Sequence, residues 1–374
     1  MQKRKWWIGL LLLLVLLAVG AGCFVAGKST EIARSNAERE LNIMLNRSDL
    51  EGLGEIEGPI YVTGHKSPDS DTVGSSIAYA KLLQKLGYDA QPVVLGSINH
   101  ETEYVLKAAG VDTPELLEDA AGCNMVLVDH SEYTQSADGL RDATIVSIID
   151  HHGDGAVTTG NQLIYDARPL GSTATIVWIR YRNYGVELDQ QTAMVMLGSL
   201  LSDTKNLQSN TTTFADREAL KVLSALSGIS DTNAFYNEMF KASLSYEGMT
   251  DEEVFHSDYK EYENGGKKYA IGCINVYDEE GAKDMVERMV KLFPGGSKSN
   301  GMDMSFAQIG IFHDDISVTF LVPFNEAAAE VIKTAFPEAE LFDDGAAYKI
   351  EPGISRKQVL VPAITAILEA HPKE

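Results

Sequence analysis

Several short apolar runs of this chain end in side chains that bind divalent metals. The clearest covers residues 144–149, a β-branched run followed directly by Asp150, His151 and His152. A run of this length and composition predicts a buried strand of a parallel sheet, so the acidic and imidazole side chains would lie where the strand leaves the sheet. Open α/β sheets bind their ligands at that edge.

Three further apolar segments repeat the pattern. They end in His65 with Asp69 and Asp71, in Asp129, and in Asp203. We expect these side chains to converge with those of the first run and to hold more than one divalent ion. Carboxylate oxygens suit Mn²⁺ and Mg²⁺, and imidazole admits Mn²⁺, Co²⁺, Fe²⁺ and Zn²⁺.

A pair of ions at this edge would suit hydrolysis at phosphorus. His65, Asp69 and Asp71 share one short loop that turns at Pro68, and either Asp129 or Asp203 could bridge to a second ion. Two ions about 3.5–4 Å apart can hold a water, lower its pKa and present a hydroxide to phosphorus without a side-chain base. One Asp-x-Asp or His-His pair alone is usually a solvated turn or a packing residue. Their joint occurrence at the ends of apolar runs favours metal binding.

The order of the predicted elements indicates an α/β fold. Predicted strands near residues 92–95, 125–128 and 144–149 alternate with helices over 72–86 and 103–109. A helix that opens at residues 171–175 and another over 191–201 follow. This alternation predicts a mostly parallel sheet with helices on both faces. A smaller α/β domain is expected after it. Its predicted strands lie near residues 268–274, 304–312, 316–322 and 346–350, and its helices near 283–292, 326–335 and 358–370.

The N-terminal segment predicts a membrane anchor. Lys3, Arg4 and Lys5 precede an uncharged stretch over residues 6–26, which at about 1.5 Å per residue can cross a hydrocarbon core of about 30 Å. A transmembrane signal anchor over residues 1–27 is favoured, with lipidation at Cys23 and a cleaved secretory peptide as alternatives. Each places the catalytic part outside the cytoplasm, and the first two hold it at the cell membrane.

The sequence predicts four consecutive segments. The membrane segment covers residues 1–27, a polar spacer with a patchy helical period covers 28–57, and the two domains cover 58–245 and 246–374.

The acidic composition limits the partners of this chain. Its formal net charge of −23 argues against a nucleic-acid surface, because phosphate backbones are held by clustered Lys and Arg. A small anionic substrate is compatible with this charge if cations at the site reverse the local field. Lys260, Arg356 and Lys357 are the candidate anion-binding side chains. A basic pair at a helix start is usually just solvated, but Arg356 and Lys357 together with helix N-terminal amides would form an anion site.

These segments resemble, in order and spacing, those of the DHH phosphoesterases, and among them the manganese-dependent family II inorganic pyrophosphatases. The resemblance extends from about Pro59 nearly to the end of the chain. It rests on Gly64-His65-Lys66-Ser67-Pro68-Asp69-Ser70-Asp71, Val128-Asp129-His130, Asp150-His151-His152, Gly171-Ser172-Thr173-Ala174-Thr175, Ser202-Asp203 and Ser355-Arg356-Lys357.

The resemblance implies a two-domain enzyme whose active site lies in the cleft between a DHH domain and a C-terminal DHH-associated domain. Two Mn²⁺ or Co²⁺ ions are implied, and a further Mg²⁺ is expected with the substrate. By position, one ion would be held by His65, Asp69 and Asp129, and the other by Asp71, Asp129, His151 and Asp203. The diphosphate would be bound by His152, Lys260, Arg356 and Lys357, which with Asp129 form the predicted catalytic set.

The sequence departs from the family pattern in three places. Gly153 and Asp154 follow the DHH triplet where a basic residue is common, and residues 207–211 replace a stretch that usually holds Lys and Pro. The membrane segment is the third departure, since family members are ordinarily soluble and cytoplasmic.

The predicted function is hydrolysis of inorganic pyrophosphate to two phosphates, by a protein that could form a homodimer. One alternative is a phosphoesterase or exopolyphosphatase acting on short polyphosphate or a small nucleotide. The superfamily branch that cleaves nucleotides carries a Gly-Gly-Gly-His sequence, and Ser355-Arg356-Lys357 stands here instead. The other alternative is a membrane-tethered protein that binds metal or phosphate with little turnover, against which the intact ligand set argues.

Overall fold

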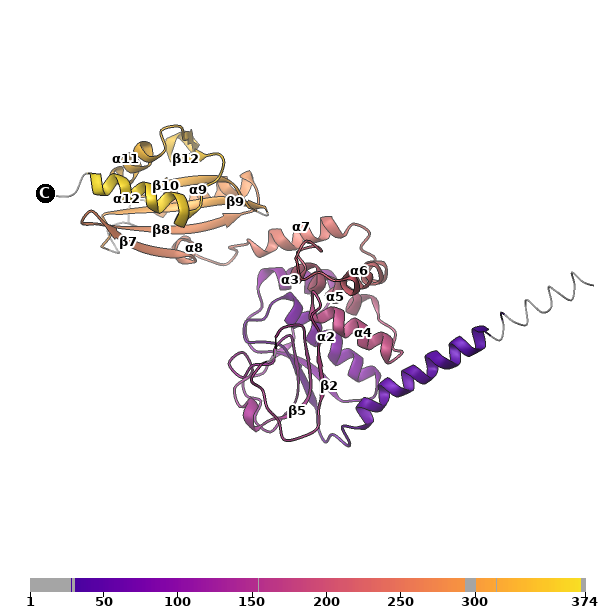
Figure 1. The fold of residues 1–374 in the computed structure, drawn as a ribbon. Coiled ribbons are helices and arrows are strands. Elements are labelled where there is room, and N and C mark those ends of the chain that lie inside the picture. The colour runs from indigo at the N-terminus through magenta and orange to yellow at the C-terminus, as the bar shows by residue number, and fades with distance from the viewer. Residues whose placement is uncertain (1–27, 29–30, 154, 293–300, 314, 371–374) are drawn as a thin grey trace, which may run out of the picture. The chain divides into compact units, whose positions relative to one another are not determined.

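The chain divides into two compact units, Met1–Met239 and Phe240–Glu374, and each is described by itself. The computed structural model describes residues 28, 31–153, 155–292, 301–313 and 315–370 (Figure 1). The domain bounds drawn from the sequence stay predictions.

A parallel sheet forms the centre of the first unit. Its described strands are β1 (Ile60–Thr63), β2 (Ala90–Val94), β3 (Glu115–Leu116), β4 (Asn124–Val128), β5 (Thr144–Asp150) and β6 (Ile164–Ala167), in the spatial order β3-β2-β1-β4-β5-β6. Strands β4 and β5 are buried along nearly their whole length, which explains their continuous apolar sequences. The chain reverses its direction of travel across the sheet between β1 and β4, the position where open α/β sheets bind ligands.

The described helices of this unit pack on one face of the sheet. Besides the helix over residues 31–51, they are α2 (Ser70–Lys85), α3 (His100–Ala109), α4 (Thr173–Asn183), α5 (Gln190–Asp203), α6 (Phe214–Ser227) and the part of α7 (Thr232–Ser243) up to Met239, and they share one apolar core with Val62, Val126 and Ile149. Helices α2 and α5 approach closely because Gly74 has no side chain: a Cβ there would lie 2.0 Å from Ser199 Oγ.

The opposite face of this sheet has no α-helix among the described residues. Met125, Leu127 and Ile148 on that face are covered by loops and by a short 3₁₀ turn, Leu140–Asp142. The expectation of helices on both faces is therefore wrong for the first unit. The connections that follow β4 and β5 are rich in Gly, Asp, Ser and Thr, and they lack the apolar period that a packed helix needs.

Residues 31–51 form a helix whose C-terminal part packs against the first unit. Leu50 is only 5% exposed and belongs to the same apolar core. Two guanidinium nitrogens of Arg47 donate to the Tyr184 carbonyl oxygen at 2.9 and 2.7 Å. Ile43 lies against Gly185, where a Cβ would come within 2.7 Å of its Cδ1. The second half of this helix is therefore part of the packed unit.

The second unit is built on a mixed sheet. Its described strands are β7 (Tyr259–Asn264), β8 (Lys267–Val276), β9 (Met304–His313), β10 (Asp315–Pro323), β11 (Glu340–Phe342) and β12 (Ala347–Ile350), in the order β11-β12-β10-β9-β8-β7. Within the described ranges, β8 and β9 are the parallel pair and the other neighbours are antiparallel.

Helices cover both faces of this second sheet. Helices α8 (Asp251–His256) and α9 (Glu279–Leu292) contribute to one apolar core, and α11 (Glu326–Ala335) and α12 (Val361–Ala370) contribute to another. The α/β class is confirmed for both units. In the part of the chain that the structure describes, no helix has the length and apolar character needed to span a bilayer. The predicted membrane segment over residues 1–27 lies outside that part.

Candidate metal centre

The predicted ligands meet at the edge of the first sheet where strand order reverses. His65 follows β1, Asp129 follows β4, and His151 follows β5, while Asp69 and Asp71 lie at the start of α2 and Asp203 ends α5. Among the described residues they form one group of His65, Asp69 and Asp129 and another of Asp71, Asp129, His151 and Asp203. Within each group, one ligand atom per residue lies within 4.8 Å of the others. Their role as ligands stays a prediction.

Asp129 is the residue that the two groups share. Its Oδ2 lies 3.5 Å from His65 Nε2 and its Oδ1 lies 3.3 Å from His151 Nε2, so the two oxygens face different groups. Hydroxyls hold both oxygens in place: Thr72 Oγ1 donates to Oδ2 at 2.8 Å and Thr173 Oγ1 donates to Oδ1 at 3.0 Å. The backbone of Asp129 has φ of 63°, in the left-handed region that Asp tolerates better than most side chains.

Asp71 is held by the start of helix α4. Its buried carboxylate accepts hydrogen bonds from Ser172 Oγ at 2.8 Å, from the backbone N–H groups of Thr173 and Ala174 at 2.6 and 3.0 Å, and from Ser75 Oγ at 3.1 Å. A helix N-terminus favours a negative charge, which explains how a buried carboxylate can remain there. Oδ2 accepts a single one of these bonds, so it keeps a lone pair for a cation.

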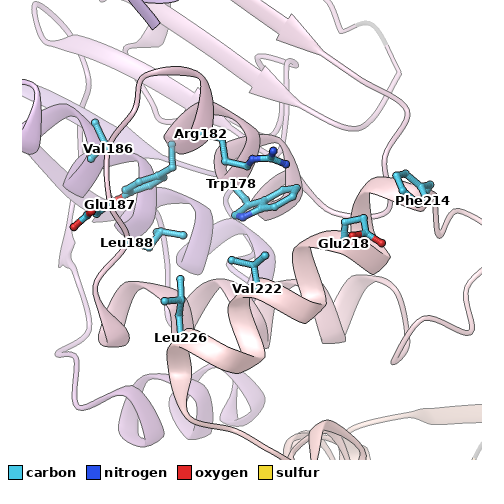
Figure 2. Close-up of a pocket in the computed structure, with 10 residues that line it drawn as sticks. Trp178, Arg182, Val186, Glu187, Leu188, Phe214, Glu218, Val222 and Leu226 are labelled. Carbon is cyan, nitrogen blue, oxygen red and sulfur yellow. The ribbon is translucent and has the colours of Figure 1, made fainter. Parts of the chain in front are cut away.

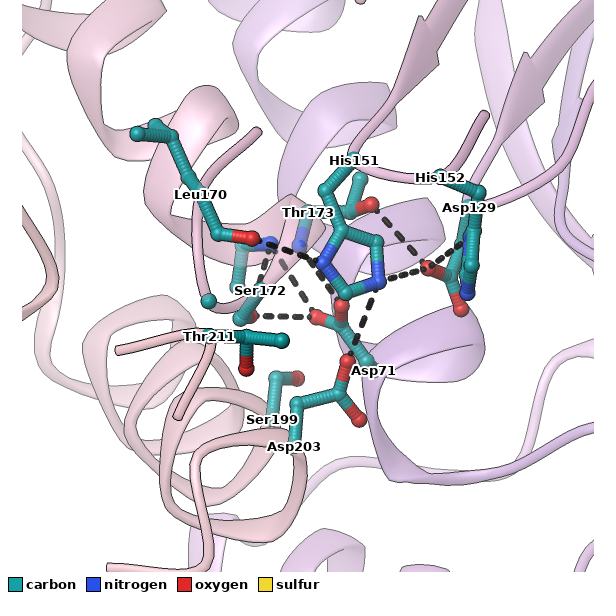
Figure 3. Close-up of polar contacts among 12 residues, drawn as sticks. Asp71, Asp129, His151, His152, Leu170, Ser172, Thr173, Ser199, Asp203 and Thr211 are labelled. Carbon is teal, nitrogen blue, oxygen red and sulfur yellow. Dashed lines mark hydrogen bonds and ion pairs between the residues drawn. The ribbon is translucent and has the colours of Figure 1, made fainter. Parts of the chain in front are cut away.

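His151 has the geometry of a metal-binding imidazole (Figure 3). Its Nδ1 lies 3.0 Å from the Leu170 carbonyl oxygen, which can only accept, so Nδ1 carries the proton. Its Nε2 lies 3.3 Å from Asp129 Oδ1 and 3.2 Å from Asp203 Oδ2. Metal-binding imidazoles commonly donate their other N–H to a backbone carbonyl in this way.

The charges of the centre also fit a divalent cation. In the described ranges, three of its four carboxylates, Asp69, Asp129 and Asp203, form ion pairs with imidazoles, and none of the four pairs with Lys or Arg. Burial and the carboxylates of Asp71 and Asp129 raise the pKa of Asp203 to about 11. Burial alone would lower the pKa of His65, but its hydrogen bonds to Asp129 and Asp69 raise it to about 10. The raised pKa values favour proton binding at Asp203 and His65. Divalent cations bound by the same side chains can replace those protons.

His152 lies beside this centre with a half-exposed side chain. Its backbone N–H and its Nδ1 both lie 3.0 Å from Asp150 Oδ1, and the hydrogen bond from the side chain raises the pKa of the imidazole. It also forms a third possible ligand group with Asp129 and His151. His130 differs, because both of its ring nitrogens are bonded within the protein, to Val128 O and Ser136 Oγ.

The three predicted basic residues lie together in the second unit. Lys260, Arg356 and Lys357 line one pocket of about 470 Å³ at the turn that enters α12. The Arg356 guanidinium is oriented by Asp258, donating to its carbonyl oxygen at 2.6 Å and to Oδ1 at 2.7 Å. The planar guanidinium can bind two oxygens of an anion such as phosphate.

A separate groove lies on α4 and α6 of the first unit (Figure 2). Its volume is about 890 Å³, and its apolar wall includes Trp178, Leu188, Val222 and Leu226. None of the predicted site residues lines this groove, so it is not part of the candidate centre.

Sequence reasoning missed the hydroxyl groups that hold the carboxylates. Thr72, Ser75, Ser172 and Thr173 each donate to Asp71 or Asp129. The Ser-Thr pair before an apolar run is a helix-start signal, but the carboxylates that accept from the two hydroxyls lie 101 and 44 residues earlier in the chain. Asp258 was also missed, since nothing near it in the sequence points to Arg356.

Comparison with known proteins gives consistent matches over most of the chain. A model of the DHH family N-terminal domain matches residues 59–200, and a model of the DHHA2 domain matches residues 237–367. A Methanocaldococcus jannaschii manganese-dependent inorganic pyrophosphatase is 35% identical, over 81% of this chain and 97% of its own length. A Clostridium acetobutylicum relative, named a probable manganese-dependent inorganic pyrophosphatase, is 35% identical over 84% of this chain and 99% of its own.

A solved structure supports the same likeness. It is a Methanococcus jannaschii protein assigned to the family II inorganic pyrophosphatases, with 35% identity and a TM-score of 0.50. The match covers 82% of this chain and 98% of that one.

Proposed function

This chain belongs to the family of manganese-dependent inorganic pyrophosphatases, and we propose that it hydrolyses inorganic pyrophosphate to two phosphate ions. The observation that carries the proposal is the convergence of His65, Asp69, Asp71, His151 and Asp203 into two groups that share Asp129. The relatives named as pyrophosphatases match over nearly their whole length, so the likeness includes both domains.

The residues of the centre fit two divalent ions, Mn²⁺ or Co²⁺. His65, Asp69 and Asp129 would hold one ion, and Asp71, Asp129, His151 and Asp203 would hold the other. Bound there, the ions would lower the pKa of a water molecule and neutralise charge that develops on phosphate. The protein's own contribution is preorganisation: Thr72, Thr173 and the N-terminus of α4 hold the carboxylates before any ion arrives, which reduces the cost of reorganising them.

The basic pocket of the second unit would bind the phosphate groups. The Arg356 guanidinium, already oriented by Asp258, can donate two parallel hydrogen bonds, and Lys260 and Lys357 add point charges. His152, whose Nδ1 is paired with Asp150, would offer its remaining nitrogen to a phosphate oxygen. These cations offset the charge of the leaving phosphate, and we infer that a Mg²⁺ ion arrives with the pyrophosphate.

Purified full-length protein with Mn²⁺ is expected to release phosphate from pyrophosphate faster than from tripolyphosphate or a dinucleotide. A chelator should abolish the activity, and added Mn²⁺ or Co²⁺ should restore it, because the ligands then regain their cations. Initial rates for the three substrates at equal concentration test this. Faster cleavage of the dinucleotide would overturn the proposed substrate, and activity that survives complete chelation would overturn the role of metal.

We also propose that residues 1–27 anchor the protein in the cell membrane with the catalytic domains outside the cytoplasm. The proposal is supported by the uncharged stretch over residues 6–26 and the three basic residues before it. The DHH match begins only at residue 59, so this segment is additional to the matched domains. The homodimer considered from the sequence stays a prediction.

Protease added to intact cells is expected to digest the domains, because an outward orientation exposes them. Immunoblotting of the C-terminal domain would follow the loss, with a cytoplasmic protein as the control for cell integrity. Full protection of the domains while lysed cells show digestion would contradict the proposed orientation.

A further inference from the structure

Glu101 connects two ligand-bearing segments that lie far apart in the sequence. One of its oxygens, Oε1, accepts a hydrogen bond from Ser70 Oγ at 2.7 Å and another from Ser202 Oγ at 2.5 Å. Ser70 stands between Asp69 and Asp71 at the start of α2, and Ser202 directly precedes Asp203 at the end of α5. A single carboxylate on α3 is therefore bonded to the neighbours of three predicted ligands.

Other hydroxyl groups reinforce this connection. Ser199 Oγ donates to the Ser70 carbonyl oxygen at 2.8 Å, and Ser70 Oγ lies 3.2 Å from Thr102 Oγ1. The start of α2, the start of α3 and the end of α5 are thus tied together by polar contacts. Because Asp71 and Asp203 are expected to hold the same ion, the spacing between α2 and α5 decides whether both can reach it.

The charge of Glu101 has no basic partner among the described residues. Glu103, on the same helix, instead pairs with His100 at 2.9 Å. In the described part of the chain, the hydrogen bonds that the Glu101 carboxylate accepts come from the hydroxyls of Ser70 and Ser202. Outer carboxylates of this kind orient ligands and strengthen the field that attracts a cation.

We propose that Glu101 is a positioning residue of the metal centre. By accepting hydrogen bonds from Ser70 and Ser202, it sets the distance between Asp71 and Asp203 and raises the affinity of their group for a divalent ion. The inference rests on the proposed function, because it takes these residues to be metal ligands.

A simpler role would be a favourable charge near the N-terminus of α3. Glu103 shares that position in the first turn, so the two glutamates should then behave alike. In that case replacing Glu101 would lower helix stability slightly and leave metal affinity unchanged.

Mn²⁺ binding to the full-length protein, measured by calorimetry without substrate, separates the two roles. Glu101→Ala is expected to weaken Mn²⁺ binding about 10–100-fold, the range found when outer-shell partners of metal ligands are removed. Glu101→Gln keeps an acceptor oxygen and should lose less affinity than Glu101→Ala. Glu103→Ala is the matched control and should bind as the unmodified protein does.

Unchanged affinity in both Glu101 variants would overturn the proposal. Thermal unfolding of the metal-free proteins checks that each variant folds. If Glu101→Ala does not fold, Ser202→Ala removes one of the two hydrogen bonds and should still weaken binding; unchanged affinity there would count equally against the proposal. This measurement uses no substrate, so it is independent of turnover. A protein that binds Mn²⁺ without cleaving pyrophosphate would refute the proposed function, while the Mn²⁺ affinities of the Glu101 variants would still test the positioning role.

Discussion

Replacing Asp129 with alanine is expected to lower pyrophosphatase activity at least about 10³-fold, or roughly 4 kcal/mol of lost transition-state stabilisation. The reason is its shared position: its two oxygens face His65 and His151 in different ligand groups. One substitution therefore removes a ligand from both groups. The value of kcat/KM with saturating Mn²⁺, together with the number of Mn²⁺ ions bound per chain, measures the effect.

Asp138→Ala provides the control for the Asp129 substitution. Asp138 is an exposed carboxylate that pairs with Lys66 outside both ligand groups, so this variant should retain activity. Circular dichroism of both variants checks folding. If Asp129→Ala kept more than a tenth of the activity with two ions still bound, Asp129 could not be a shared ligand.

Replacing Arg356 with alanine is expected to lower kcat/KM about 10²-fold while leaving Mn²⁺ affinity unchanged. Its guanidinium is oriented by Asp258 before any substrate binds, and preorganised donors of this kind are worth about 10²–10³-fold in rate when removed. The kcat/KM of Arg356→Lys should lie between those of the unmodified protein and of Arg356→Ala, because a lysine keeps the charge but loses the planar guanidinium. Steady-state kinetics with pyrophosphate and metal titration distinguish the two effects.

Lys349→Ala is a suitable control for Arg356. Lys349 belongs to the same unit, and its Nζ lies 3.6 Å from Glu279 Oε1. It is not among the residues that line the basic pocket. Its loss should leave kcat/KM unchanged. An Arg356→Ala enzyme with an ordinary kcat/KM would mean that this pocket does not bind the substrate.

The sequence was sufficient to predict the α/β class and the convergence of the metal-binding side chains. Residues 125–128 and 144–149 are apolar runs without alternation, which indicates strands buried on both faces. Parallel strands present their carboxyl ends at one edge, so Asp129 and His151 had to lie close together. Here local sequence patterns determined a long-range result.

Other features depend on contacts that local patterns do not encode. Ser202 and Glu101 are separated by 101 positions, and Ser172 and Asp71 by 101 positions. Serines and threonines occur widely in turns and helix starts, so no spacing indicates which carboxylate they will meet. The face of the first sheet that loops cover was mispredicted for a related reason, because alternation of elements indicates the fold class but not which connections form helices.

The helix over residues 31–51 is attached to the first unit at one end only, where Ile43, Arg47 and Leu50 pack. Its first twelve residues project about 18 Å beyond Ile43, at about 1.5 Å per residue. The helix should behave as a rigid extension of the unit. The packing of these three side chains would then set the direction in which the chain leaves the unit. Under the proposal that residues 1–27 anchor the protein, deleting whole turns of this helix would bring the first unit closer to the membrane, and deleting half a turn would also rotate it.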